Sequence, residues 1–568
     1  MLTTDHAPRL GGTLSALILA PMVAHTTWRA AAVALGSATA GRSLAVSLSA
    51  VAVAALAGAA CWRAPRPAGL PQGAVLGAAL VLGLGVSGMA GAVSLLGVGA
   101  ATLLALPRVI AALSSLQDTI GAPAPAALIT WSVMALGCAA GSVDLATYLG
   151  DPSVEGHGIY GDGIIHRHLC LSAYLHAAEL IRSGIPNVYD LSLIPAAGSG
   201  VLPETAQHMA PFELDRFGYP PQFLLLPLAL IAVIDDFTVQ RAVWTCLNAL
   251  VFAAALWRVG LWVGPRSGRI LRWTAPALWL LGGATYQAGN IQLPLLGLGV
   301  LAMIAFDEQR ERVGGALLAG VTLAKIAPGL LGVLLLVQRR WRGVGWTVAV
   351  AVALSGLTLL VVGPEPFEAF LEYHLPRVSS GVAYDFLDDT PRLIFENLSP
   401  FGLPFKLAEL GVGRDPWVWG PRFASAYTVA AFLLTVLVGR RTLDRRGHAA
   451  VWMLILTIAA LRSPMGPGYL LAGVFWALAL TGAEVQDVRG RLIGGLLVAA
   501  MMLTTPFAPI NMWAALAGQA VMHGVIVWLL LRTWPVLDPA LQPHRLGNDA
   551  LSAAHVDSTL LRKTKLAG

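Results

Sequence analysis

The chain has 568 residues, of which 56% are hydrophobic and 12% are charged, and its mean hydropathy is +0.70. Soluble domains carry about 25% charged residues, so this composition excludes a water-soluble fold. The net charge of +6 comes almost wholly from arginines in short loops between apolar runs, which indicates membrane topology and gives no sign of a nucleic-acid partner.

Apolar runs of about twenty residues recur along the whole chain, and each can cross a hydrocarbon core of about 30 Å as a helix. The sequence therefore predicts an all-α, polytopic integral membrane protein with about 12–14 transmembrane helices. The first five runs lie within residues 1–142. The first run lacks a convincing cleavage site, so we expect a retained span and no signal peptide.

The arginine clusters predict which segments face the same compartment. If the clusters are cytoplasmic, residues 143–218 and 364–422 form two large extracytoplasmic loops. Residues 219–363 are then a transmembrane core, and residues 423–532 are C-terminal transmembrane helices. Residues 533–568 are polar and are expected to form a cytoplasmic tail.

Two apolar segments do not fit simple crossings. Residues 313–337 have basic residues on both flanks, so both ends are expected in the cytoplasm. A broken-helix hairpin satisfies this, with the break between Lys325 and Pro328, because proline lacks an N–H and disfavours helical backbone before it. Residues 219–234 are shorter, and the sequence leaves open whether they cross the membrane.

Lys325 is the only lysine within an apolar run. A lone ammonium there is costly unless it meets an anion, a polar cavity or the membrane interface. One interpretation is a lysine that binds a phosphate. The alternative is a side chain that snorkels from a short hairpin arm to the cytoplasmic surface.

The first outside loop gathers charged groups: it holds five of the 12 histidines and nine of the 31 acidic residues. Within it, residues 168–183 have helical period, with Ser172, His176 and Glu179 on one face and apolar residues on the other. This pattern predicts an interfacial helix on the outer leaflet. The alternative is a loop helix packed on the bundle with its polar side in water.

Asp162 lies between two glycines, just before His166, Arg167 and His168. A flexible carboxylate beside basic groups near a membrane suits a general base that faces a phosphorylated lipid. The alternative is a solvated aspartate in a turn. Asp162, His166 and His168 lack the spacing that makes a zinc pattern specific, so we predict no metal site and no cofactor, with a divalent cation left open.

Several short segments follow one another in an order and spacing that no single one of them would establish. They are residues 174–180, 219–221, 289–292, 325–328 with 339–342, 373–377, 396–399 and 461–464. Together they resemble the family 87 mannosyltransferase group of the superfamily C glycosyltransferases, which use polyprenyl-phosphate sugars. Residues 289–292 are similar to its Gly-Gln-x-Asn element, and residues 325–328 to its Lys-x-x-Pro hairpin.

The resemblance implies an inverting transfer in which a loop aspartate deprotonates an acceptor hydroxyl, and the hydroxyl attacks a sugar carried on polyprenyl phosphate. Cys170 stands where the family has its acid, so the aspartate is to be chosen between Asp162 and Asp144. The implied groups that bind the donor phosphate are Lys325, Arg167, His168 and Arg377. The implied substrate-binding residues are His166, Tyr219, Asn290, Gln292, His374 and Asn397.

The resemblance also implies the partners and the location. The donor is a polyprenyl-phosphate sugar, with mannose or another hexose or pentose, and the acceptor is a lipid or glycan. Membrane lipids are the remaining partner. We expect a multi-pass protein of a bacterial cytoplasmic membrane with an extracytoplasmic active site.

Two other classes of protein stay open. A lipid-linked oligosaccharide polymerase or ligase also has many spans and two outside loops, but it typically uses paired arginines in those loops, whereas these loops are richer in acids and histidines. A transporter places ionisable groups at mid-membrane between repeated halves, and apart from Lys325 the apolar runs lack them.

Overall fold

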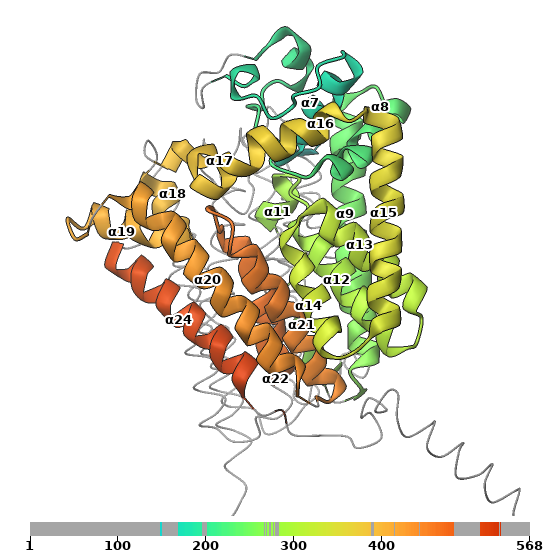
Figure 1. The fold of residues 1–568 in the computed structure, drawn as a ribbon, viewed down its shortest axis with the longest axis vertical. Helices are drawn as coiled ribbons and strands as arrows, with labels where there is room; N and C mark the ends of the chain where they lie inside the picture. The colour runs from blue at the N-terminus through green and yellow to red at the C-terminus, as the bar shows by residue number, and fades with distance from the viewer. Residues whose placement is uncertain are drawn as a thin grey trace, which may run out of the picture.

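The computed structural model describes residues 148–149, 169–195, 202–265, 267–268, 270–271, 274–275, 278, 283–387, 391–413, 415–441, 443–481, 512–532 and 534. The described chain is helical and contains no β-strand (Figure 1). Four described helices are long and apolar enough to cross a membrane: α9 (Phe237–Trp262), α15 (Trp341–Val362), α20 (Pro416–Gly439) and α24 (Met512–Leu531). The prediction of an all-α polytopic membrane protein is confirmed. The five N-terminal runs and most of the tail lie outside the described residues.

The first loop and the segment that follows it fold into short helices at one end of the bundle (Figure 1). They are α7 (Cys170–Arg182), η2 (Leu191–Leu193), η3 (Glu204–Met209), η4 (Pro221–Leu224) and α8 (Leu225–Val233). The η4 and α8 helices together have 13 residues, about 20 Å at the α-helical rise, which is shorter than a hydrocarbon core. The apolar run 219–234 therefore does not cross as a helix.

The α7 helix forms where the helical period predicts it. The prediction that its polar face is directed to water is wrong. Ser172 is 0% exposed and His176 is 3% exposed. The Ser172 hydroxyl lies 2.9 Å from the Glu213 carbonyl, and His176 Nε2 lies 3.3 Å from the Thr205 hydroxyl. The later part of the same loop thus covers the polar face of α7, which periodicity along one helix cannot reveal.

The predicted broken hairpin is present. The α11 (Gly283–Gln287) and α12 (Gln292–Asp307) helices lead into α13 (Glu311–Ala324), which ends at Lys325 in extended backbone. The η5 turn (Ala327–Gly329) then starts α14 (Leu330–Val337). The start of α13 lies beside the start of α15, since a Cβ on Gly343 would lie 2.9 Å from Glu311 Oε2. The α13 helix packs between α12 and α15.

The second loop is also built of short helices. They are α16 (Glu365–Glu368), the π-helical η6 (Ala369–His374), α17 (Leu375–Ser380), η7 (Val382–Leu387), α18 (Pro391–Glu396), η8 (Pro400–Gly402) and α19 (Leu403–Glu409). The α20 helix begins at Pro416, inside the segment 364–422 expected to be loop. It begins there because the Asp415 carboxylate accepts a hydrogen bond from the Trp417 N–H at 2.9 Å and Pro416 fits the first turn.

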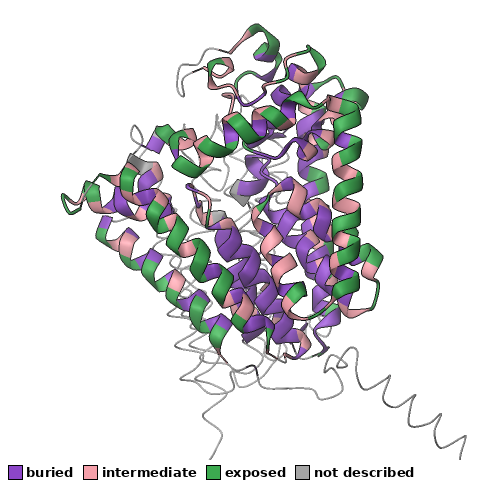
Figure 2. Cartoon of the chain, viewed as in Figure 1, coloured by how far each residue is buried: buried purple, intermediate pink, exposed green. Residues whose placement is uncertain are grey.

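The core of the described bundle is α21 (Arg445–Ala460), with every residue from Arg446 to Ala459 buried (Figure 2). It starts at Asp444, whose carboxylate accepts a 2.7 Å hydrogen bond from the Gly447 N–H. The α21 helix packs on α12, on α22 (Ala472–Thr481), which follows η9 (Gly468–Leu471), and on α24. By contrast, α15 exposes most of its apolar length, as expected of a helix that faces lipid (Figure 2).

Candidate functional site

The candidate site lies where the break in the hairpin meets the first loop. The Lys325 Nζ donates a hydrogen bond to Gln292 Oε1 at 3.0 Å, and it lies 5.5 Å from the centre of the Tyr219 ring. Fourteen residues of α13, about 21 Å of helix, separate Lys325 from the arginines at the start of the hairpin. The ammonium therefore faces the first loop, and it does not snorkel to the arginine-rich surface.

The turn at residues 289–292 places Gln292 opposite Lys325. Gly289 has a φ of 65°, and a Cβ on it would lie 2.9 Å from the Leu171 side chain, so glycine is required there. The Asn290 carboxamide oxygen accepts from the Gln292 N–H at 2.9 Å, and its amide nitrogen lies 3.2 Å from Cys170 Sγ. Asn290 is thus a buried turn residue that accepts a hydrogen bond from the first residue of α12.

Aromatic side chains form the wall beside the ammonium. The Tyr174 and Tyr219 hydroxyls are 2.7 Å apart, and the Tyr219 and Phe223 rings stack at 4.7 Å. Burial raises the pKa of Tyr219 well above its usual value, and the neighbouring Cys170 and Asp215 raise it further. Tyr219 therefore stays a neutral phenol that can donate or accept a hydrogen bond.

The second loop closes over the first. The His374 ring stacks on Tyr189 at 4.7 Å, and the Tyr189 hydroxyl donates to the Tyr219 carbonyl at 2.8 Å. Burial lowers the pKa of His374 to about 4, although a hydrogen bond with the Gly218 backbone opposes this. His374 is thus a neutral packing group between the loops at physiological pH.

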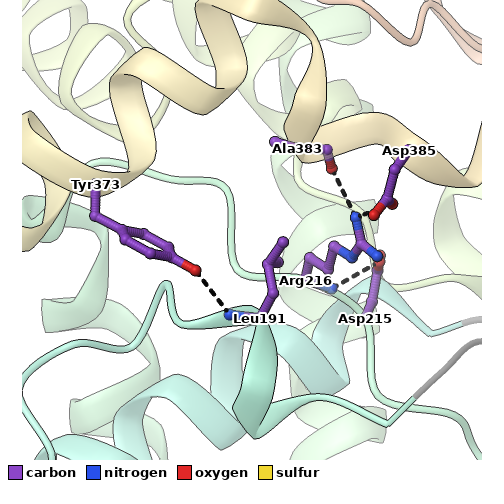
Figure 3. Close-up of polar contacts among 6 residues, drawn as sticks. All are labelled: Leu191, Asp215, Arg216, Tyr373, Ala383 and Asp385. Atoms are coloured by element: carbon purple, nitrogen blue, oxygen red, sulfur yellow. Dashed lines mark hydrogen bonds and ion pairs between the residues drawn. The ribbon is translucent and has the colours of Figure 1, made fainter.

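Three further hydrogen bonds join the loops (Figure 3). The Arg216 guanidinium donates to Asp385 Oδ1 at 2.6 Å and to the Ala383 carbonyl at 3.0 Å. The Tyr373 hydroxyl accepts from the Leu191 N–H at 3.3 Å. Segments 169 residues apart in sequence are therefore joined into one surface.

Asp215 is the carboxylate that sequence reasoning passed over. Its negative charge raises the pKa values of both Tyr219 and Tyr384, after burial as the larger cause, so its carboxylate lies near both rings. Its own N–H donates to the Ser172 hydroxyl at 3.2 Å. The Tyr384 hydroxyl in turn lies 3.3 Å from the Ser463 hydroxyl. Asp215 is one of the nine acidic residues of the first loop, and only the fold selects it.

The remaining predicted residues lie in different surroundings. Asn397 is 0% exposed, and its carboxamide bonds to the Pro464 carbonyl at 2.8 Å and to the Ser399 and Gly466 N–H groups at 2.9 Å. It therefore clamps the second loop to the end of α21. The Arg377 guanidinium lies 3.9 Å over the Tyr373 ring, in a group of contacts separate from those of Lys325.

Several predicted residues lie outside the described part of the chain. They are Asp144, Asp162, His166, Arg167 and His168. Within the part that is described, no group of three or more His, Cys, Asp or Glu side chains is placed to hold a metal ion.

The fold and the site together define an all-α polytopic membrane protein whose polar groups gather where two structured loops cover a broken helix. Residues 217–464 match the model of glycosyltransferase family 87, which confirms the resemblance over that segment. The matched segment begins beside Tyr219, includes Lys325 and ends at Pro464. Over that segment the chain is similar to membrane glycosyltransferases. No curated protein matches the chain.

Proposed function

We propose that the protein transfers a sugar from a polyprenyl-phosphate donor to a hydroxyl of a lipid or glycan acceptor, with inversion at the anomeric carbon. The observation that carries this proposal is the position of Lys325. Its ammonium has one hydrogen-bond acceptor within the described residues, the neutral Gln292 carboxamide, and no carboxylate lies within ion-pair distance. A phosphate would supply the missing negative charge.

The reaction needs one proton acceptor and one group that stabilises the leaving phosphate. The acceptor hydroxyl loses its proton to a carboxylate of the first loop, its oxygen bonds to the anomeric carbon, and the bond from that carbon to the phosphate oxygen breaks. The negative charge that develops on the lipid phosphate is stabilised by Lys325. The candidates for the base are Asp162 and Asp144 from the sequence, and Asp215 from its place beside Tyr219.

The orientation is part of the proposal. Arginines gather at the end of the bundle opposite the two structured loops, and this distribution favours a cytoplasmic arginine-rich end. The two loops and the site then face the outside of a bacterial cytoplasmic membrane. Mannose is the sugar that the family resemblance favours.

The test is a transfer assay with the purified full chain in detergent. A short-chain polyprenyl-phosphate mannose carrying labelled mannose is incubated with membrane lipid extract, and labelled glycolipid is separated and quantified. We expect a labelled product of opposite anomeric configuration, resolved by NMR, from the wild type and from Lys563→Met, a tail lysine used as control. Transfer at the wild-type rate by Lys325→Met, or transfer from a nucleotide sugar without lipid donor, would contradict the proposal.

A further inference from the structure

Two tight connectors lie side by side at the end of the bundle opposite the site. One joins α12 to α13 and the other joins α14 to α15, and each turns through a residue of left-handed backbone, Gln309 with a φ of 60° and Arg339 with a φ of 56°. The helices that follow the connectors start side by side, since a Cβ on Gly343 of α15 would lie 2.9 Å from Glu311 Oε2 of α13. Their side chains therefore form one surface.

This surface is basic. The acids of the first connector are already paired, since Asp307 lies 3.5 Å from Arg445 and Glu308 forms an ion pair with Arg258. Arg310 forms a second ion pair with Glu308, with 3.9 Å between the guanidinium nitrogen and the carboxylate oxygen. Glu311 is the remaining carboxylate, near Arg340 and Arg342. Arg312 and Arg339 have no carboxylate partner within ion-pair distance in the described residues, and both are exposed.

Apolar groups border the arginines on the side that faces lipid. Trp341 is 64% exposed and Trp346 is 39% exposed. The Arg312 guanidinium lies 5.0 Å over the Trp346 ring, and the neighbouring Val313 is exposed. From Trp341 the α15 helix continues as an apolar, largely exposed helix long enough to cross a membrane (Figure 2).

We infer that this surface, formed by Arg312, Arg339, Arg342, Trp341 and Trp346, binds an anionic phospholipid. Guanidinium groups pair with a headgroup phosphate, indole rings lie at the membrane–water interface, and an acyl chain follows the apolar face of α15. The basic groups require a lipid of net negative charge, because a zwitterionic headgroup carries its own cation. This inference does not depend on the transferase chemistry.

The experiment measures lipid retention by native mass spectrometry of the full chain from mixed micelles with phosphatidylglycerol or phosphatidylcholine. The test variant is Arg312→Gln/Arg339→Gln/Arg342→Gln. The matched control is Arg422→Gln/Arg440→Gln/Arg532→Gln, which removes the same charge from two exposed arginines and one half-buried arginine elsewhere. Since each interfacial arginine contributes on the order of fivefold to anionic-lipid binding, we expect the test variant to retain phosphatidylglycerol at least tenfold more weakly than the wild type or the control.

Each outcome decides the inference. Preferential retention of phosphatidylglycerol that is lost in the test variant supports it. Equal retention of both lipids by the wild type, or equal losses in the test and control variants, would overturn it in favour of unspecific charge attraction. If the triple variant fails to fold by size-exclusion chromatography, Arg342→Gln alone takes its place, with about fivefold weaker retention expected and unchanged retention as the contrary result.

Discussion

The ammonium of Lys325 and the carboxamide oxygen of Gln292 are 3.0 Å apart, and this contact joins the end of α13 to the start of α12. Both groups are held by helix termini, because Lys325 ends α13 in extended backbone and Gln292 is the first residue of α12. The polar pair is therefore fixed by backbone, and a donor phosphate would meet a cation that is already in place.

Replacing Lys325 should affect donor binding in a graded way. Methionine keeps the apolar stem and removes the charge, so affinity for a short-chain polyprenyl-phosphate sugar should be lost. Arginine keeps the charge but is larger and planar, so it should restore affinity only in part. Equilibrium binding in detergent measures both variants, and equal affinity in all three proteins would leave Lys325 without a role in donor recognition.

Replacing each candidate base by its amide should identify the proton acceptor. We expect the correct Asp→Asn variant to lower kcat by about 10²–10⁴-fold with donor affinity retained, because the proton acceptor is lost and the shape is kept. The variants are Asp144→Asn, Asp162→Asn and Asp215→Asn, assayed together. Glu204→Gln, an exposed loop acid, is the control. Wild-type turnover in all three variants would show that the base lies elsewhere.

Exposed positions in the two loops should react from outside the cell. Single cysteines at Gln207 and Glu372, both exposed, should be labelled by an impermeant thiol reagent added to whole cells. A cysteine at the exposed Arg440 should be labelled only after the cells are broken. Reaction of Arg440→Cys in intact cells, with protection of the other two, would reverse the orientation.

The contact between Arg216 and Asp385 should hold the second loop with little effect on global stability. Arg216 and Asp385 side chains are 31% and 55% exposed, so the pair is screened by water and contributes about 0–1 kcal/mol. We expect Arg216→Ala to raise hydrogen exchange in residues 382–387 with an unchanged Tm. The exchanged pair Arg216→Asp/Asp385→Arg should restore part of the protection, and unchanged exchange in Arg216→Ala would count against the contact.

The packing between the loops should weaken in acid. Burial lowers the pKa of His374 to about 4 and that of His176 to about 4, from an ordinary value of 6.5. Between these values the unfolded chain binds more protons than the folded chain, so stability present above pH 6.5 is lost as the pH falls toward 4. Thermal unfolding at pH 7 and pH 5 should show a smaller difference for His374→Phe than for the wild type or for His208→Gln.

Local sequence signals predicted the hairpin and its break because Pro328 and the flanking arginines act within a few residues of where they lie. The helix at residues 170–182 was also predicted from local sequence, by its helical period. The burial of its polar face could not be predicted in this way, since it depends on residues 202–218 packing against that face. The selection of Asp215 likewise requires Tyr384, which lies about 170 residues away in sequence.

Lys406 shows the same limit. It lies in a stretch that sequence assigns to a loop, yet it is 0% exposed and donates to Gln519 Oε1 of α24 at 2.9 Å. Burial lowers its pKa to about 7. Composition predicts exposure for a loop lysine, and only the docking of α19 on α24 buries it.

The broken hairpin makes the depth of the Lys325 ammonium a function of helix length. Each residue of an α-helix adds about 1.5 Å of length and about 100° of rotation. One residue added to α13 would therefore rotate Lys325 away from Gln292. Four added residues would return it nearly to the same face, displaced by about 6 Å along the axis of α13. The length of α13 thus sets how far from the arginine-rich end of the bundle a phosphate must lie to reach the Lys325 ammonium.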